Sequence, residues 1–327
     1  MRKKEIKMGA YGLHQYELHG TIWTPDDGIV TKVIHVVHGL TEHMGRYEAF
    51  AEDLTQYGIA VVGFDLRGHG RNSGDLDCAS FMSGQKIDGD YGWERSVEDI
   101  KAEINRFKKY FPSQEYYLLG FSLGSFLVRD YIRTVRIGKD VNGIILAGTG
   151  YQPAFVTGMM KVVAKSQIPK ANVGGTTDLV RRLAFGTYNS YFDPEETGCG
   201  MEWLCSDMQQ LSCYMKDPLV KKDIAADLFY EMLKCMHKVN RKRRWKRNVN
   251  DLSNIPVLIF SGSEDAVGNM GKGIHKVVEI METYGAQSIK RIILKGARHD
   301  IFHEYESGNY DRMIRILLHW MGFNHDE

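Results

Sequence analysis

The sequence predicts an α/β protein with a mostly parallel sheet, helices on both faces and an inserted helical segment. Short β-branched runs alternate along the chain with longer segments of helical apolar spacing. This order is typical of parallel strands, because each needs a crossover connection that places a helix on the sheet. The alternation stops between residues 151 and 250 and then resumes, which indicates an insertion within one α/β domain.

Six short runs are predicted to form the strands of this sheet, and several of them are nearly continuously apolar, as in strands that are buried on both faces. They cover residues 31–38, 59–64, 115–119, 141–146, 257–261 and 289–294. Residues 13–23 alternate more weakly and are predicted to form an antiparallel strand at the N-terminal edge. Apolar residues at helical spacing mark residues 274–281 and 310–321, which we expect to cover the sheet.

Residues 151–250 are predicted to form a helical cap on a core of residues 1–150 and 251–327. Apolar residues recur at helical spacing from Leu228 to Met236, and seven of the fifteen methionines fall in this segment. Methionine adapts to irregular apolar shapes, so the cap is compatible with an adaptable wall around an apolar ligand. A buried helical core has the same composition and is the alternative.

The composition excludes several classes of protein. The 327 residues are 43% apolar and 25% charged, which suffices for a core without disulfides or metal. With 42 basic and 41 acidic residues the net charge is +1, so no nucleic-acid partner is expected. No apolar run is long enough to span a membrane. The five cysteines form no C-x-x-C pair and no signal segment is evident, so a cytoplasmic protein is predicted, with a mature secreted form as the alternative.

A run of Gly-x-Ser-x-Gly, residues 120–124, gives the strongest local signal for chemistry. It follows a predicted strand and precedes an amphipathic helix. Such a sharp turn strains the serine backbone and exposes its oxygen above the sheet. The new helix also directs its N–H groups to that point, where negative charge can develop. The pattern predicts a nucleophile at Ser122, and a plain turn with a capping serine is the alternative.

Two further residues can activate this serine, whose hydroxyl needs a base to become a nucleophile. Asp265 and His299 each come just after a predicted strand. Because the carboxyl ends of parallel strands share one edge of a sheet, both are expected to lie near Ser122. Glu264 is the alternative acid and His303 the alternative base.

Two backbone donors for an oxyanion are predicted near Ser122, one next to it in the sequence and one in another loop. Acyl transfer creates a negatively charged oxygen, which two N–H groups can stabilise. Leu123 follows Ser122, and Leu40 follows His38-Gly39 at the end of a predicted strand. A tight turn with a buried histidine is the alternative for the second site.

Other polar segments carry less chemistry. Asp65 and Arg67 are predicted to brace a glycine-rich loop through hydrogen bonds and an ion pair. Residues 241–247 include six basic residues around Trp245, which fits a solvated face or a transient contact with an anionic lipid surface. No nucleotide-binding or metal-binding motif is present, so no cofactor and no metal are expected.

These motifs together resemble the monoacylglycerol lipase and lysophospholipase group of α/β-hydrolases. The resemblance covers about residues 15 to 322, with the motifs in family order. It rests on His38-Gly-Leu-Thr-Glu-His43, Arg46-Tyr47, Asp65-x-Arg-Gly-His-Gly70, Gly120-x-Ser-x-Gly124, Gly262-Ser-Glu-Asp265 and Gly296-Ala-Arg-His299.

The resemblance implies an α/β-hydrolase fold with an inserted helical cap and a triad of Ser122, Asp265 and His299. It implies Leu40 and Leu123 as the oxyanion donors. The implied substrates are small carboxylic esters with an apolar acyl chain, of the monoacylglycerol or lysophospholipid type. An amidase or peptidase of the prolyl aminopeptidase type, an acyltransferase and a non-catalytic ligand-binding homologue are the alternatives.

The resemblance also suggests five substrate-binding candidates. Glu42, His43 and Arg46 belong to a loop that lies by the pocket in monoacylglycerol lipases. Phe121 stands next to the nucleophile, where many members have histidine. His303 follows the predicted base by four residues, where the animal lipase has a second histidine after three.

Overall fold

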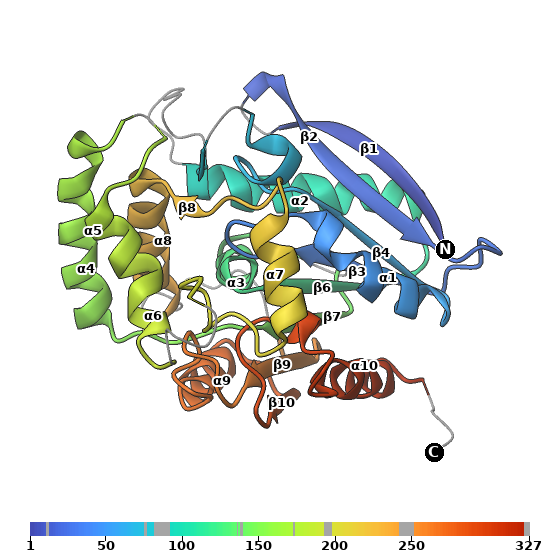
Figure 1. Cartoon of the computed structure of the whole chain (residues 1–327). Coiled ribbons are helices and arrows are strands. Elements are labelled where there is room, and N and C mark those ends of the chain that lie inside the picture. The colour runs from blue at the N-terminus through green and yellow to red at the C-terminus, as the bar shows by residue number, and fades with distance from the viewer. Residues whose placement is uncertain are drawn as a thin grey trace.

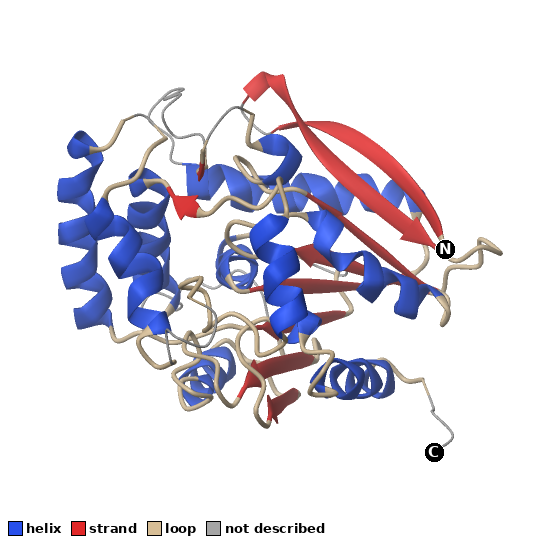
Figure 2. Ribbon diagram, in the orientation of Figure 1, coloured by secondary structure: helices blue, strands red, loops and turns tan. Residues whose placement is uncertain are grey.

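A computed structural model describes residues 1–10, 13–74, 77–81, 92–135, 137, 140–172, 174–192, 198–241 and 252–323. Within these residues an eight-stranded sheet has the order β1-β2-β4-β3-β6-β7-β9-β10 (Figures 1 and 2). Its strands are β1 (Arg2–Ala10), β2 (Leu13–Thr24), β3 (Lys32–Val37), β4 (Ile59–Phe64), β6 (Glu115–Phe121), β7 (Gly143–Ala147), β9 (Val257–Gly262) and β10 (Ile289–Leu294).

Six neighbouring strands of this sheet, β4, β3, β6, β7, β9 and β10, pair in parallel. The predicted mostly parallel sheet is therefore confirmed. β1 and β2 form an antiparallel hairpin, and β2 pairs antiparallel with β4. The sequence pattern predicts only the second strand of this hairpin. The first, β1, is the edge strand and carries five charged residues in its first six positions. Charged side chains are common on exposed edges, and here they hide the apolar pattern of a strand.

Helices cover both faces of the sheet. One face packs against α2 (Gly92–Tyr110), α3 (Leu123–Thr134) and α9 (Ile274–Thr283), and the other against α1 (Glu48–Thr55) and α10 (Asn309–Trp320). Val33 and Ile34 are consecutive on β3 and belong to the two different cores, since neighbouring strand residues point to opposite faces.

The segment between β7 and β9 is helical, as the sequence predicts. Its helices are α4 (Ala154–Gln167), α5 (Asp178–Arg181), α6 (Thr187–Asn189), α7 (Met208–Lys216) and α8 (Ala226–Val239). In Figure 1 α4, α5, α6 and α8 form a group beside the sheet, and α8 packs against both α4 and α3. The strand β8 (Asp223–Ile224) pairs with β5 (Cys78–Ala79) and so joins this segment to the rest of the chain. The division into core and cap stays a prediction.

Short helical turns complete the described structure. The 3-10 turns are Met44–Tyr47, Gly70–Asn72, Ile168–Lys170 and Ile301–His303, and Arg182–Gly186 is a π-helical turn. In the part of the chain that the structure describes, no helix has the length and apolarity needed to cross a bilayer. Residues 242–247 of the predicted basic run, with Trp245, lie outside the described residues.

Candidate active site

Ser122 occupies the turn between β6 and α3. Its backbone has φ 50° and ψ −116°, which is strained for a residue other than glycine. The flanking glycines leave no room for a side chain. A Cβ atom on Gly124 would lie 1.9 Å from the Val37 carbonyl oxygen, and one on Gly120 would lie 2.6 Å from the Gly124 oxygen. The glycines therefore let β3, β6 and α3 approach closely at the serine.

The structure brings Ser122, His299 and Asp265 into one hydrogen-bonded chain. His299 Nε2 lies 2.8 Å from Ser122 Oγ, and His299 Nδ1 lies 2.8 Å from Asp265 Oδ1. A carboxylate only accepts, so Nδ1–H donates to Asp265 and Nε2 is free to accept from the serine hydroxyl. Asp265 and His299 are buried while Ser122 is partly exposed, which leaves the oxygen accessible to a substrate.

Asp265 is held in place from two sides. The Val267 N–H donates to Oδ1 over 2.9 Å, and the Ser261 hydroxyl lies 3.4 Å from Oδ2. Glu264, the alternative acid, is exposed and makes no side-chain contact with His299 within the described residues. The structure therefore brings Asp265 to the histidine and leaves Glu264 in solvent.

Leu40 and Leu123 both lie beside Ser122 on the wall of one cavity. Leu123 is the first residue of α3, and N–H groups in a first helical turn have no intrahelical acceptor. Leu40 lies in the loop after β3. Glu42 fixes this loop, since its Oε1 accepts from the Gly39 N–H and from the Tyr47 hydroxyl.

The same loop is tied to the inserted helices. His43 Nε2 lies 2.9 Å from Asp217 Oδ2, just after α7. The Lys221 N–H donates to the Thr41 carbonyl oxygen over 2.9 Å. Thr41 has φ 67°, so the loop is held in a left-handed conformation that threonine rarely adopts.

A buried network of charges joins two residues of the cavity wall, Glu42 and Asp300, to Arg46 and His303. Arg46 contacts both Glu42 Oε2, at 3.1 Å from Nε, and Asp300 Oδ2, at 2.8 Å from Nη2. His303 Nδ1 lies 2.8 Å from Asp300 Oδ2, and its Nε2–H donates to the Arg46 carbonyl oxygen. Burial raises the pKa of Glu42. Burial also acts to raise the pKa of Asp300, but His303 and Arg46 outweigh it and hold that pKa below its usual range.

The predicted substrate contacts divide into two groups. Glu42 and Phe121 line the cavity. His43, Arg46 and His303 do not belong to its lining among the described residues. They brace the loop that carries Leu40 and the segment after His299.

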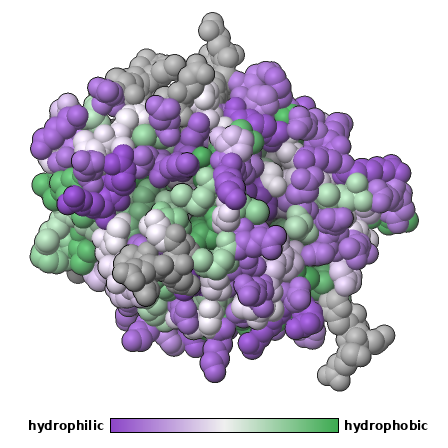
Figure 3. Space-filling model, in the orientation of Figure 1, coloured by the Kyte–Doolittle hydropathy of each residue, from purple (hydrophilic) through white to green (hydrophobic). Residues whose placement is uncertain are grey.

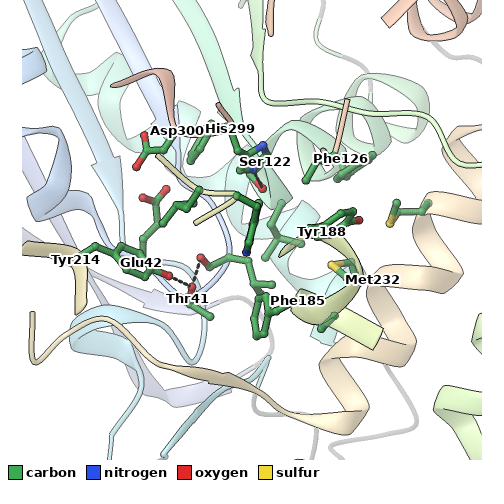
Figure 4. Close-up of a pocket in the computed structure, with 18 residues that line it drawn as sticks. Thr41, Glu42, Ser122, Phe126, Phe185, Tyr188, Tyr214, Met232, His299 and Asp300 are labelled. Carbon is green, nitrogen blue, oxygen red and sulfur yellow. Dashed lines mark hydrogen bonds between the residues drawn. The ribbon is translucent and has the colours of Figure 1, made fainter. Parts of the chain in front are cut away.

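The cavity and its mouth hold about 660 Å³ of space not occupied by atoms (Figure 4). The α/β core and the inserted helices both contribute to its walls. Most of the lining side chains are apolar or aromatic. The lining residues that the sequence analysis did not predict are Thr41, Phe126, Ala184, Phe185, Tyr188, Trp203, Leu204, Tyr214, Met232, Met236, Val267 and Asp300.

Only part of this wall left a signal in the sequence. Met232 and Met236 follow the helical spacing that marks α8. Trp203 lies in a segment without such spacing, yet its ring centre is 5.1 Å from that of His299. Phe121 lies at 5.2 Å, so His299 is in contact with both aromatic rings.

Asp65 and Arg67 brace the loop after β4 through hydrogen bonds and ion pairs, as predicted. Asp65 accepts from the Met44 N–H at 2.8 Å and from Arg71 Nε at 2.9 Å, while Arg67 pairs with Asp99. Both residues therefore stabilise the surrounding structure. Within the described residues no cluster of three His, Cys, Asp or Glu side chains is arranged to hold a metal ion.

The chain is similar to known hydrolases. The profile of a hydrolase family described as serine aminopeptidase, S33, matches residues 28–306. The chain belongs to this family. It is 26% identical over 273 residues to the monoglyceride lipase homolog of monkeypox virus, covering 83% of each chain. It is 23% identical over 291 residues to the human monoglyceride lipase, covering 86% of this chain and 83% of that protein.

Solved structures share the fold of this chain. A carboxyl esterase from Bacillus coagulans, in complex with glycerol, superimposes with a TM-score of 0.81 at 22% identity, covering 98% of each chain. This likeness confirms the predicted α/β-hydrolase fold. The predicted resemblance to monoacylglycerol lipases and the predicted class of carboxylic ester hydrolase are likewise confirmed by the matches.

Proposed function

We propose that this hydrolase cleaves carboxylic esters with an apolar acyl chain, of the monoacylglycerol or lysophospholipid type, through Ser122, His299 and Asp265. The observation that carries the proposal is the pair of 2.8 Å hydrogen bonds among these three side chains at the wall of an apolar cavity. A pocket of this kind, apolar with a few polar groups converging at one place, is typical of small-molecule enzymes.

The mechanism follows the order of the hydrogen bonds. His299 Nε2 takes the proton of Ser122 as Oγ attacks the ester carbonyl. The carbonyl oxygen becomes an oxyanion that accepts from the N–H groups of Leu40 and Leu123. His299 then gives the proton to the leaving alcohol, and later activates the water that releases the acid. Asp265 keeps Nδ1 protonated and stabilises the imidazolium.

The charges of the cavity favour an ester over an aminopeptidase substrate. A free α-amino group needs an unneutralised carboxylate in the pocket. Of the described lining residues only Glu42 and Asp300 are carboxylates, and both pair with Arg46. The remaining wall is mainly apolar, which suits an acyl chain.

The test is turnover of p-nitrophenyl esters from acetyl to palmitoyl, with aminoacyl anilides as the amide arm. We expect ester turnover that varies with chain length, little amide turnover, and labelling of Ser122 by a fluorophosphonate. Ser122→Ala should abolish turnover and labelling, while Ser125→Ala at the same turn should keep most activity. Turnover near the wild-type level in Ser122→Ala, or faster turnover of amides than of esters, would overturn the proposal.

We also propose that the protein meets its substrate at a lipid surface through α4. Phe155, Met159 and Val162 recur at i, i+4 and i+7 on this helix and are 75%, 56% and 70% exposed. Apolar side chains show at this edge of the molecule in Figure 3, where Figure 1 places α4. The helix carries two lysines and no acidic residue, which favours an anionic interface.

Vesicle sedimentation tests this contact. The double variant with Phe155→Ser and Val162→Ser should bind phosphatidylserine-containing vesicles at least about fivefold more weakly than the wild type. The control is Ile29→Ser, since Ile29 is 64% exposed on the loop between β2 and β3. Equal binding by the wild type and the double variant would rule out α4 as the contact.

A further inference from the structure

Arg129 is a fully buried arginine where the inserted helices join the α/β core. It lies on α3, seven residues after Ser122, and has an exposed fraction of 0%. Nη1 donates to the Gly150 carbonyl oxygen over 3.0 Å, and Nη2 donates to Asn240 Oδ1 over 2.8 Å. Gly150 lies between β7 and α4, and Asn240 directly follows α8. One side chain therefore holds both ends of the inserted helical segment.

Two weaker contacts strengthen the same arrangement. Nη1 also lies 3.4 Å from the Thr149 hydroxyl, and Nη2 lies 3.4 Å from the Val239 carbonyl oxygen at the end of α8. The last carbonyls of a helix have no intrahelical donor and carry partial negative charge. The guanidinium supplies both the missing donor and the opposite charge.

A neutral side chain could fill this position with a smaller loss of solvation free energy. Burial lowers the pKa of Arg129 to about 10, which still leaves the group charged at neutral pH. The acceptors found for it among the described residues are two carbonyls, a hydroxyl and an amide, none of them a carboxylate. Burying a charge without an ion pair is unfavourable. The planar guanidinium group, however, has donors in a fixed fork and can bond to both ends of the insertion at once.

Arg129 and the acceptors that it contacts at Thr149, Gly150, Val239 and Asn240 are called the clamp below. The clamp is next to the apolar wall of the cavity. Phe126 lies on the same face of α3, between Ser122 and Arg129, and lines the cavity. Its ring centre is 5.5 Å from the guanidinium carbon. On α8, Met232 and Met236 also line the cavity, and Met236 is only four residues before Asn240. Figure 4 shows Phe126 and Met232 beyond Ser122, on the side away from Glu42.

We propose that Arg129 is a positioning residue that fixes α8 against α3 and thereby determines which acyl chain lengths the enzyme prefers. The proposal rests on the proposed ester hydrolysis at Ser122. A long acyl chain needs the wall formed by Phe126 and the two methionines of α8. An acetyl group occupies only the space beside Ser122, so its turnover is independent of the clamp.

The test compares acetyl and dodecanoyl esters in Arg129→Met and Arg129→Lys. In Arg129→Met we expect kcat/KM for the dodecanoyl ester to fall about tenfold, mainly through KM, while that for the acetyl ester changes by less than about twofold. Arg129→Lys should give an intermediate ratio, because lysine keeps the charge but not the fork. Asn240→Ala should shift the ratio in the same direction and be non-additive with Arg129→Met.

The control is Arg133→Met, one turn further along α3. Arg133 pairs with Asp130 and, among the described residues, has no bond to Gly150 or Asn240, so its loss should leave the ratio of the two esters unchanged. Equal losses for both esters in Arg129→Met, or an unchanged ratio, would overturn the proposal. Fluorophosphonate labelling of Ser122 verifies that each variant retains an intact site.

A second readout separates this proposal from the proposed function. Amides near the end of α8 should exchange hydrogen faster in Arg129→Met than in the wild type, whatever the substrate. If the wild type hydrolyses no ester, the proposed function fails. Unchanged exchange in Arg129→Met would show that the side chain does not fix α8, and would overturn the clamp by itself.

Discussion

The hydroxyl of Tyr214 lies 2.6 Å from the hydroxyl of Thr41. Tyr214 belongs to α7 and lines the cavity, and its ring centre is 4.7 Å from the guanidinium carbon of Arg46. Thr41 directly follows Leu40, whose N–H we propose as an oxyanion donor. A helix of the inserted segment thus holds the loop that carries this proposed donor.

The first prediction concerns this contact. Tyr214→Phe removes the hydroxyl that contacts Thr41 and leaves the Thr41 hydroxyl bonded only to the Leu40 carbonyl oxygen. The loop is then held less firmly, so the Leu40 N–H loses part of its alignment. We expect kcat on a short ester to fall about three- to tenfold with KM within about twofold, because only the transition state carries the oxyanion. Tyr188→Phe is the control, since Tyr188 also lines the cavity. Identical kcat losses in the two variants would argue against a specific role for Tyr214.

A second prediction distinguishes the two adjacent acids. Asp265→Asn keeps the shape but removes the charge that orients His299, so kcat should fall about a thousandfold or more. Glu264→Gln should change kcat by less than about twofold, since Glu264 is exposed. Steady-state kinetics of the two variants decides the matter, and the opposite ranking would transfer the role to Glu264.

The third prediction concerns stability. Arg46→Met removes the only side chain that contacts both Glu42 and Asp300 within the described network. It leaves buried Glu42 without its basic partner and Asp300 with His303 alone. The free energy of unfolding in urea should fall by about 3 to 5 kcal/mol. Arg181 also contacts two carboxylates, but its side chain is 47% exposed. Arg181→Met should therefore cost less than about 1 kcal/mol, and a loss as large as that of Arg46→Met would contradict this account.

A fourth prediction follows from His38, which is fully buried. The Leu66 N–H donates to Nε2 and Nδ1–H donates to the Gly39 carbonyl oxygen, so both ring nitrogens are satisfied in the neutral form. Burial lowers the pKa of His38 to about 4. Between pH 6.5 and pH 4 the unfolded chain therefore binds a proton that the folded protein does not, and stability falls as the pH falls.

Urea unfolding at pH 7 and pH 4.5 tests this effect. His38 alone should account for a loss on the order of 2 to 3 kcal/mol between these pH values. His38→Gln should reduce the loss, because glutamine does not titrate. His319→Gln on the exposed side of α10 should leave it unchanged. A pH dependence in His38→Gln as steep as that of the wild type would disprove the assignment.

Much of the sheet could be predicted from the sequence because buried parallel strands are apolar on both faces. Residues 31–38 were expected to form a strand, and β3 covers Lys32–Val37. The edge strand β1 escaped prediction because its exposed residues are charged. Among the first six residues of β1, Ile6 is the only buried apolar side chain.

The polar residues of the site could be predicted for a related reason. Ser122, Asp265 and His299 each follow a strand directly, and the carboxyl ends of parallel strands must meet at one edge. The wall of the cavity could not be predicted in the same way. Trp203 lies between helices, and its contact with His299 depends on how the whole insertion folds back over the sheet.

The close packing at Gly124 has a consequence for how this enzyme can vary. The start of α3 and the end of β3 are in close contact at this point, since a methyl group on Gly124 would overlap the Val37 oxygen. We therefore expect substitutions beside Ser122 to disturb this packing, and substitutions that alter substrate preference to be tolerated mainly at the more distant walls of the cavity.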